Sequence, residues 1–281
     1  MRLIKMVREM RSFSHRAHAA GKTVAFVPTM GALHEGHLEL VRRAHQNGDR
    51  VVVSIFVNPT QFGPKEDLSR YPRDLKGDLA TLKPCKVDAV FFPRVADIYP
   101  KDDHTVVDVA GVTEGLCGAI RPGHFRGVAT VVLKLFNIVS PDVALFGEKD
   151  FQQLATIRQL VRDLHLPVKI VGVPTVRERD GLAMSSRNRY LTAEQRLQAL
   201  ALPKALHAAC EMVRRGLDDP ERVKEMVIKM LQRDVRIRID YVDICDPKTL
   251  RPMQHCRGGR ILAAINIGAT RLIDNWALPK K

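Results

Sequence analysis

The sequence predicts an α/β fold: a doubly wound parallel sheet followed by a smaller C-terminal α+β domain. Two observations carry this prediction. Short runs of β-branched and aromatic residues recur in the first part of the chain, mostly without polar alternation, which is typical of parallel strands buried on both faces. Distinctive polar segments directly follow several of these runs, as ligand-binding segments do at the carboxyl ends of such strands.

The first domain is predicted to span residues 1–176, and alternating strands and helices define it. Its strands are predicted at residues 23–27, 51–57, 88–92, 142–146 and 168–173. Helices are predicted between them at residues 38–46, 75–82, 128–139 and 151–164.

The second domain is predicted to span residues 177–281. Thr192 and Gln195 have the spacing of a capping box, which opens a helix. Asp219 precedes Pro220, and proline is favoured in the first turn of a helix, so a second helix is predicted there. Strands at residues 236–245 and 260–267 complete the α+β pattern.

Composition narrows the class of protein. No apolar run approaches the ~20 residues that span a bilayer, and no secretory signal precedes the first domain, so we expect a cytoplasmic protein without a membrane partner. The five cysteines are scattered, which favours free thiols. The net charge of +14 raises the alternative of nucleic-acid binding, but the basic residues are dispersed and aromatic residues make up only 5%, so no nucleic-acid partner is expected.

Two histidines, His34 and His37, follow the first predicted strand of the sheet, with Gly31 and Gly36 beside them. The predicted helix that follows would place them in its first turn, three residues apart and on one face. Free N–H groups and the dipole make this position suitable for phosphate. The alternative is a pair of solvent-exposed or capping histidines.

Two further segments have phosphate-binding character. Residues 184–187 have the sequence MSSR, in which two hydroxyls lie beside a guanidinium, and Lys149 follows another predicted strand. Taken singly, the MSSR segment could be a polar surface turn, and Lys149 could be a solvated side chain in a turn that Asp150 caps. Together, HxGH and MSSR resemble the HIGH and KMSKS elements of the nucleotidyltransferase superfamily, although Ala183 stands where KMSKS has its first lysine.

Longer segments resemble the pantothenate synthetase (pantoate–β-alanine ligase) family: residues 28–37, 56–62, 121–127, 147–153, 179–188 and 270–275. The resemblance covers essentially the whole chain. It implies a Rossmann-like nucleotidyltransferase fold, a homodimer, and an ATP-dependent ligase that uses Mg²⁺, adenylates pantoate and transfers the pantoyl group to β-alanine, giving pantothenate. The rivals are another nucleotidyltransferase, a truncated aminoacyl-tRNA synthetase, and a basic RNA-binding protein without enzymatic activity.

The resemblance also implies roles for individual residues. Catalytic roles fall to His34, His37 and Lys149, with His37 as proton donor. Pantoate would contact Gln61 and Gln153, and Gln61 would also help to place β-alanine. ATP would contact Met30, Gly31, Ala32, Leu33, His34, Glu35, Gly36, His37, Gly147, Glu148, Lys149, Asp150, Val176, Met184, Ser185, Ser186 and Arg187.

Two points stay open. Family members tend to carry an acidic pair near a metal, whereas here Gly77 precedes Asp78, so a single acid weakens the case for a metal ligand at Asp78. Arg121 and His124 lie in a glycine-rich segment that either closes over phosphates or forms a surface turn.

Overall fold

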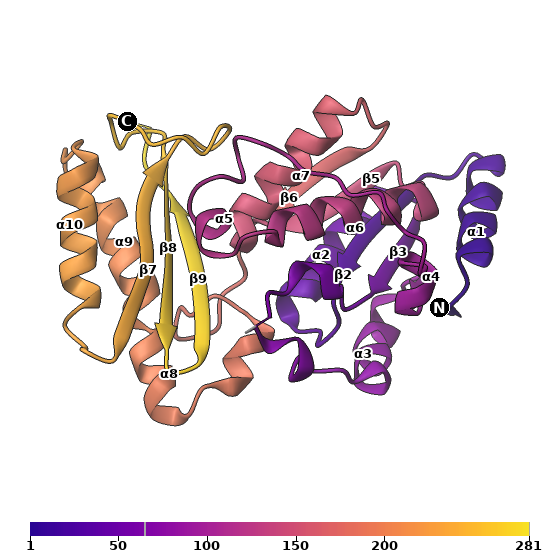
Figure 1. Ribbon diagram of the computed structural model, residues 1–281, viewed down its shortest axis with the longest axis horizontal. Helices are drawn as coiled ribbons and strands as arrows, with labels where there is room; N and C mark the ends of the chain where they lie inside the picture. The colour runs from indigo at the N-terminus through magenta and orange to yellow at the C-terminus, as the bar shows by residue number, and fades with distance from the viewer. Residues whose placement is uncertain (65, 281) are drawn as a thin grey trace. The chain divides into compact units, whose positions relative to one another are not determined.

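The computed structural model describes residues 1–64 and 66–280, which form two compact units (Figure 1). Unit 1 contains Met1–Ala110, Arg121–Glu148 and Thr156–Pro174, and unit 2 contains Gly111–Ile120, Lys149–Ala155 and Thr175–Lys281. Both units are discontinuous in sequence, because two short segments before residue 175 group with the C-terminal part. The predicted division at residue 176 remains a prediction about functional domains.

Unit 1 is built on a six-stranded sheet with the order β1-β4-β3-β2-β5-β6, in which the strand pairs are parallel. The strands are β1 (Arg2–Ile4), β2 (Val24–Thr29), β3 (Arg50–Ile55), β4 (Ala89–Phe91), β5 (Val143–Gly147) and β6 (Lys169–Val173). The chain proceeds outward from β2 in one direction and then resumes at β5 on its other side. This reversal confirms the predicted doubly wound sheet and places a switch point between β2 and β5.

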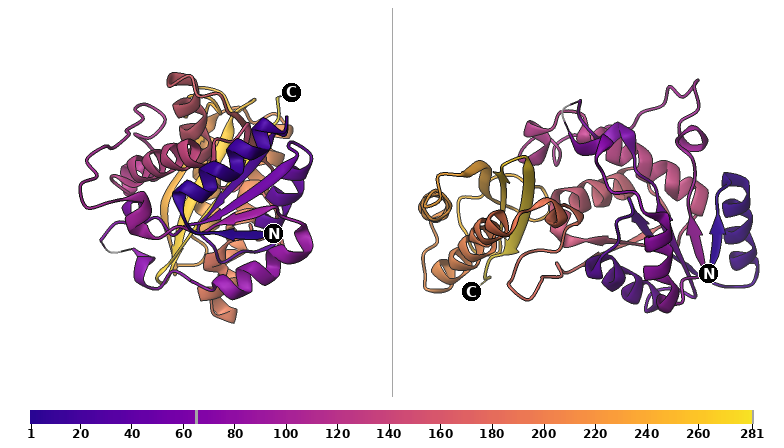
Figure 2. Two further views of the ribbon diagram at one scale, coloured as in Figure 1. Left: turned by 90° about the vertical axis from the view of Figure 1, so that its right-hand side faces the viewer. Right: turned by 90° about the horizontal axis from the view of Figure 1, so that it is seen from below.

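Helices pack on both faces of this sheet. On one face, Val27 and Val53 of the strands pack with Val41 of α2 (Glu35–His45) and Leu82 of α3 (Leu75–Leu82). On the other, Phe26 meets Phe136 of α6 (His124–Val139) edge-on, and α1 (Val7–Ala19) packs against α6. The left view of Figure 2 shows helices on both sides of this sheet. The principal helices are α1 (Val7–Ala19), α2 (Glu35–His45), α3 (Leu75–Leu82) and α6 (His124–Val139), with the short α4 (Val95–Ile98).

The remaining strands and α-helices belong wholly or partly to unit 2. Its sheet is antiparallel with the order β7-β8-β9, formed by β7 (Ile237–Cys245), β8 (Arg260–Ile267) and β9 (Thr270–Ala277). The helices are α5 (Cys117–Ile120), α8 (Ala193–Ala199), α9 (Ala201–Arg214) and α10 (Pro220–Leu231), and α7 (Phe151–Asp163) begins in unit 2. The α+β prediction is confirmed, although the first predicted helix is two helices, α8 and α9.

Both sequence signals for helix starts in unit 2 are confirmed. The hydroxyl of Thr192 accepts a hydrogen bond from the N–H of Gln195, whose side chain accepts from the N–H of Thr192. Asp219 caps α10 by accepting from the N–H groups of Glu221 and Arg222. These caps satisfy backbone donors that a helix leaves unpaired at its start.

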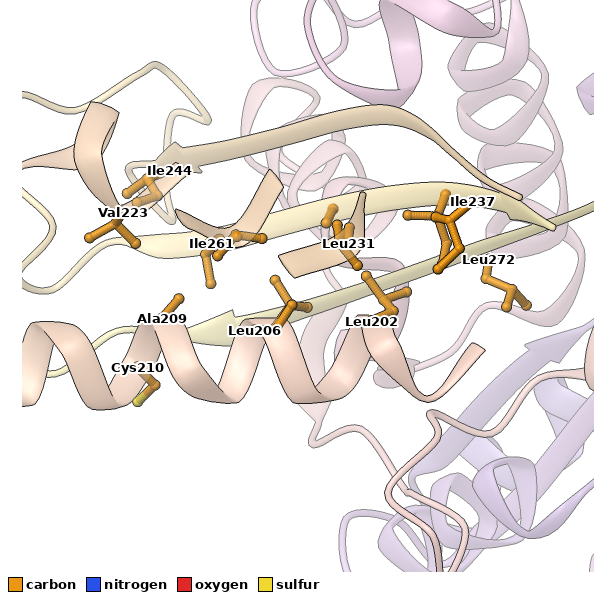
Figure 3. Packing of buried hydrophobic residues seen from close by; sticks show 14 of the residues in the cluster. Leu202, Leu206, Ala209, Cys210, Val223, Leu231, Ile237, Ile244, Ile261 and Leu272 are labelled. Carbon is orange, nitrogen blue, oxygen red and sulfur yellow. The ribbon is translucent and has the colours of Figure 1, made fainter. Parts of the chain in front are cut away.

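The core of unit 2 lies between its sheet and helices α9 and α10 (Figure 3). Leu202 and Leu206 of α9, Leu231 of α10 and Ile261 of β8 are at most 1% exposed. Figure 3 shows these side chains gathered between the helices and the strands. Truncating one such leucine to alanine costs ~2–5 kcal/mol of stability, because it removes buried apolar area and leaves a cavity.

No helix among the described residues is both long and apolar enough to cross a bilayer. The five cysteines are free, in agreement with the sequence. Burial raises the pKa of Cys245 to about 12 and that of Cys256 to about 11, so neither provides a thiolate near neutral pH.

Candidate active site

The loop that follows β2 is a tight turn at the carboxyl end of the strand. The Thr29 hydroxyl donates to the Ser54 carbonyl at 2.7 Å and accepts from the N–H of Gly31 at 3.2 Å. Gly31 has a φ of +80°, and a Cβ placed on it would lie 2.8 Å from a carboxylate oxygen of Asp78. Glycine is therefore required here both for its backbone conformation and for space.

The Asp78 carboxylate stabilises this turn through hydrogen bonds from its backbone. It is 5% exposed and accepts hydrogen bonds from two consecutive backbone donors, the N–H of Ala32 at 3.1 Å and that of Leu33 at 2.8 Å. Both oxygens thus serve the backbone of the predicted ATP-binding segment. Among the described residues, no group of three or more His, Cys, Asp or Glu side chains could hold a metal ion. Because both of its oxygens accept from the backbone, Asp78 positions this turn, and its predicted role as a metal ligand stays a prediction.

His34 and His37 form a reciprocal cap at the start of α2. The Nδ1 atom of His34 accepts from the N–H of Gly36 at 3.2 Å, and the Nδ1 atom of His37 accepts from the N–H of His34 at 3.3 Å. The ring centroids lie 4.1 Å apart. His34 is the N-cap, with extended backbone, so the prediction that both histidines lie in the first turn was wrong for His34.

This cap fixes the chemistry of both rings. An Nδ1 atom that accepts a hydrogen bond carries no proton, so each neutral imidazole must carry its proton on Nε2. The capping alternative and the phosphate-binding hypothesis are therefore compatible, because Nδ1 of each ring caps the start of the helix while Nε2 is a donor. Two Nε2–H donors beside a helix N-terminus suit an anion.

Gln61 lies in a short 3-10 helix, η1 (Pro59–Gln61), beyond the end of β3. Its side-chain oxygen accepts from Asn58 Nδ2 at 3.1 Å, and its nitrogen lies 3.2 Å from the sulfur of Met30. The residue is 8% exposed. Because thioether sulfur is a weak acceptor, a ligand oxygen could replace it as partner of this amide.

The backbone carbonyl of Gln61 is held by two side chains whose role the sequence left open. Arg121 Nη2 donates to it at 3.2 Å, and Nδ1 of His124 lies 2.8 Å from it. Arg121 also binds both oxygens of Glu66 at 2.6 Å, and its Nη1 lies 3.0 Å from Nε2 of His124. His124 must then donate through Nδ1 and accept through Nε2, which requires the neutral ring.

Glu66 stays ionised in this arrangement. Burial raises the pKa of Glu66, but the hydrogen bonds and charge of Arg121 outweigh burial and hold the pKa below its ordinary value. A close approach of α6 completes the support: a Cβ on Gly127 would lie 2.5 Å from the Thr60 carbonyl oxygen and 2.7 Å from the Gln61 nitrogen. Arg121 and His124 are therefore not a simple surface turn, and their closure over phosphates stays a prediction.

The carboxyl end of β5 adjoins that of β2, because the two strands pair in parallel through Ala25 with Val143 and Phe26 with Ala144. Gly147 ends β5, and Glu148 begins the 3-10 helix η4 (Glu148–Asp150). Unit 1 therefore brings the ends of β2, β3 and β5 to one edge of its sheet. The segment 30–37 follows β2, Gln61 follows β3, and Gly147 is the last residue of β5. This is the edge that the sequence predicted.

Unit 2 holds the other predicted residues. The Lys149 side chain is 20% exposed, its Nζ lies 3.6 Å from an Asp150 oxygen, and its carbonyl accepts from Asn275 Nδ2 at 3.0 Å. Gln153 lies half-buried on α7. Lys149 and Ser185 line the same cavity of about 10 Å³, which has room for about one water molecule. The buried side-chain oxygen of Asn188, which also lines it, has no hydrogen-bond partner among the described residues.

Val176 and Met184 meet across a hairpin, in which the N–H of Met184 donates to the Val176 carbonyl at 3.0 Å. The Ser185 hydroxyl then caps the 3-10 helix η5 (Ser186–Tyr190) by accepting from the N–H of Arg187 at 3.2 Å. Gly181, with a φ of +94°, allows the hairpin to turn. The hairpin thus links Val176 to the MSSR segment, which the sequence had assigned to ATP separately.

The ion pair that anchors this hairpin joins two residues that no sequence motif connects. Arg177 binds both oxygens of Asp274 on β9, at 2.7 and 3.0 Å, and its guanidinium lies 4.1 Å from the ring centroid of Trp276. The Asp274 side chain is 1% exposed. A bidentate pair of this kind fixes orientation as well as distance.

Similarity to known proteins shows the family of this chain. A sequence model for the family described as pantoate-beta-alanine ligase matches residues 2–277. The chain belongs to the pantoate–β-alanine ligase family. The pantothenate synthetase of Heliobacterium modesticaldum is 54% identical over 279 residues, which cover 99% of each chain. The family and the enzyme class that the sequence predicted are confirmed.

Solved structures of the pantoate–β-alanine ligase family have the same fold. The enzyme of Thermus thermophilus has a TM-score of 0.95 at 48% identity, covering 99% of this chain and 100% of its own. The pantoate-beta-alanine ligase of Francisella tularensis, described as a complex with beta-gamma ATP and beta-alanine, has a TM-score of 0.78 at 34% identity, covering 99% and 97%.

Proposed function

We propose that this protein condenses (R)-pantoate with β-alanine, using ATP, to give pantothenate, AMP and diphosphate through a pantoyl adenylate. Family membership over the whole chain supports this reaction. The observation that carries the proposal is the reciprocal cap of His34 and His37. It places the Nε2 proton of each neutral ring beside a helix N-terminus that follows a strand's carboxyl end.

The first half-reaction needs alignment and charge neutralisation more than a base. A carboxylate is already a nucleophile, so pantoate attacks the α-phosphorus of ATP without losing a proton. Diphosphate leaves, and negative charge grows on the phosphate oxygens. The Nε2–H groups of His34 and His37 and the ammonium of Lys149 are the donors that we assign to this charge, with His37 as proton donor.

The pantoate contacts are assigned to the amides of Gln61 and Gln153. An amide both donates and accepts, so it can bind hydroxyl and carboxylate groups alike. Gln61 is supported by its buried and oriented side chain, held by Asn58 and, through the backbone, by Arg121 and His124. Gln61 also helps to place the amine of β-alanine, which attacks the acyl carbon and displaces AMP.

The ATP contacts are assigned to both units. In unit 1 they are residues 30–37 together with Gly147 and Glu148. In unit 2 they are Lys149, Asp150, Val176 and residues 184–187. The support in unit 2 is the single hairpin that carries Val176 and the MSSR segment, and the cap formed by the Ser185 hydroxyl.

We further propose that Mg²⁺ accompanies ATP, and that the protein is a cytoplasmic homodimer. Mg²⁺ commonly keeps its waters and binds substrate phosphates with few protein ligands. Both Asp78 oxygens accept from backbone donors, so we assign Asp78 to the turn and Mg²⁺ to the substrate phosphates. Bound to the phosphates, Mg²⁺ would neutralise part of their charge.

A substrate-dependence assay tests the reaction. Purified protein with ATP and Mg²⁺ should release diphosphate when pantoate is added and AMP when β-alanine is added as well. Omission of pantoate should abolish both products. Equal AMP formation with an amino acid and tRNA in place of pantoate would assign the protein to a different reaction of the superfamily.

The pantoate assignment has its own test. Gln61→Ala and Gln153→Ala should each weaken pantoate binding by ~1–3 kcal/mol, which is about 5- to 150-fold in affinity, because polar groups of the ligand lose their partners. ATP affinity should change much less. Gln159→Ala, on the same helix as Gln153 but paired with Asp163, is a matched control that should leave both affinities unchanged. If ATP affinity falls as far as pantoate affinity, the assignment is wrong.

A further inference from the structure

A cavity of about 790 Å³ lies in unit 1, away from the residues assigned to catalysis. Its lining includes Arg2 at the start of β1, Lys22 just before β2, Arg50 at the start of β3, and Asp88 just before β4. It therefore lies at the amino ends of the parallel strands. The segment 30–37 and Gln61 follow the carboxyl ends of the same sheet.

The lining is strongly basic. It contains six cationic side chains and one carboxylate, that of Asp88. The cations come from β1, from α1, from the segments before β2 and β4, and from β3. They are Arg2, Arg16, Lys22, Arg50, Lys83 and Lys86. Phe13, Ala17 and Val87 add an apolar part to the wall.

The carboxylates nearby neutralise little of this charge. Asp88 pairs with Arg50 at 3.0 Å and accepts from the N–H of Val51 at 2.9 Å. Asp49 lies 3.8 Å from Lys22 and also accepts hydrogen bonds from Thr23, which help to lower its pKa. The four other cations form no ion pair among the described residues: Arg2, Arg16, Lys83 and Lys86.

We infer that this cavity is a second ligand site, which binds a small anion carrying two or more phosphate groups. Four cations without a carboxylate partner around one cavity raise the local positive potential, which favours an anion with several negative charges over one with a single charge. The volume is that of a small-molecule pocket. A nucleic-acid track would need a longer basic stripe with aromatic stacking surfaces, and Phe13 is the lone aromatic residue of the described lining. This inference does not depend on the reaction proposed above.

The length of the strands separates this cavity from the residues that are assigned to catalysis in unit 1. A six-residue strand such as β2 or β3 is ~20 Å long. A phosphate at the amino ends therefore cannot contact groups that lie beyond the carboxyl ends. Binding at the cavity should be separable from binding of ATP as substrate.

Tripolyphosphate is the probe, and amide hydrogen exchange of the intact protein locates where it binds. Tripolyphosphate should protect residues 11–22 and 82–88, whereas protection of residues 30–37 reports the catalytic edge independently. The variant R16Q/K83Q/K86Q should bind the probe at the cavity about tenfold or more weakly. The three side chains are exposed, so the variant should keep its fold, and circular dichroism checks this. The KM for ATP should stay unchanged.

The control variant K204Q/R215Q/K248Q removes the same charge from exposed positions of unit 2 and should retain cavity binding. Orthophosphate should protect the cavity segments far less than tripolyphosphate, because it reaches fewer cations. Three results would overturn the inference: protection confined to residues 30–37, an equal loss of binding in the control variant, or equal protection by orthophosphate.

Discussion

Asp78 gives the sharpest test of how the structure supports ATP binding. Its two oxygens accept from the N–H groups of Ala32 and Leu33 inside the protein. In Asp78→Asn, one oxygen remains, and the new amide N–H₂ faces a backbone donor. One buried donor is left unsatisfied, which costs ~1–3 kcal/mol. If the unsatisfied donor destabilises the ATP-binding conformation of the turn by this amount, the KM for ATP should rise about 5- to 150-fold.

Initial rates over a range of ATP concentrations, at saturating pantoate and β-alanine, measure this effect. The series is repeated at several Mg²⁺ concentrations, because a metal ligand and a positioning residue then differ: excess Mg²⁺ should rescue the loss of a ligand but not a disordered turn. Asp74→Ala is the matched control, since Asp74 caps the same helix through Gly77 without reaching the turn. An unchanged KM for ATP in Asp78→Asn, or its recovery at high Mg²⁺, would refute the positioning role.

Three further outcomes are expected. His37→Ala and Lys149→Ala should each slow adenylate formation ~10²–10³-fold. In single turnovers that start from synthetic pantoyl adenylate, Lys149→Ala should form the amide at a nearly normal rate. Equal slowing of both half-reactions would contradict the assignment of Lys149 to the departing phosphates. Glu66→Gln should lower the free energy of unfolding by an amount that is constant above pH 4.5, the ordinary pKa of the carboxyl. This difference from the unchanged protein should vanish as the pH falls through the depressed pKa of Glu66, which urea unfolding at several pH values can measure. A stability difference that persists in acid would exclude the ion pair as its source. Asp274→Asn should raise the KM for ATP and leave the KM for pantoate nearly unchanged, because Arg177 in the hairpin loses one of its two charged acceptor oxygens. Steady-state kinetics that show the reverse would contradict the assignment of the hairpin to ATP binding.

The sequence was sufficient for features that depend on local pattern. Buried parallel strands have continuous apolar runs, so five strands of unit 1 were located to within a few residues. Helix α3 was predicted with its observed bounds, Leu75–Leu82, and the capping box at Thr192 was identified from spacing alone. The order of these elements placed the HxGH segment after a strand, which is where the structure has it.

Elements with weak local patterns were missed. Strand β1 has three residues at the sheet edge, too few to show a period. Helix α1 buries only Met10, Ser14 and Ala17, so its apolar stripe is narrow. Helix α2 begins at Glu35, before the predicted start, because His34 caps it, and histidine is not among the usual capping residues.

The supports of the candidate site could not be predicted either, because they join distant parts of the chain. Asp78 lies 45 residues from Leu33 in sequence, Arg121 55 residues from Glu66, and Asp274 97 residues from Arg177. No spacing rule relates residues so far apart. Only the fold brings each pair together.

These supports share one physical design. Asp78, Glu66 and Asp274 are carboxylates that hold the main chain or an arginine behind a proposed ligand-binding segment. A carboxylate offers several lone pairs and a full charge, so one side chain can fix two donors at once. In a chain with 31 acidic against 45 basic residues, carboxylates are the scarcer partners, and neutralising one of these three deprives its donors of a charged acceptor. Conservative amide substitutions at these positions should therefore weaken ligand binding, even though none of the three is assigned to touch a substrate.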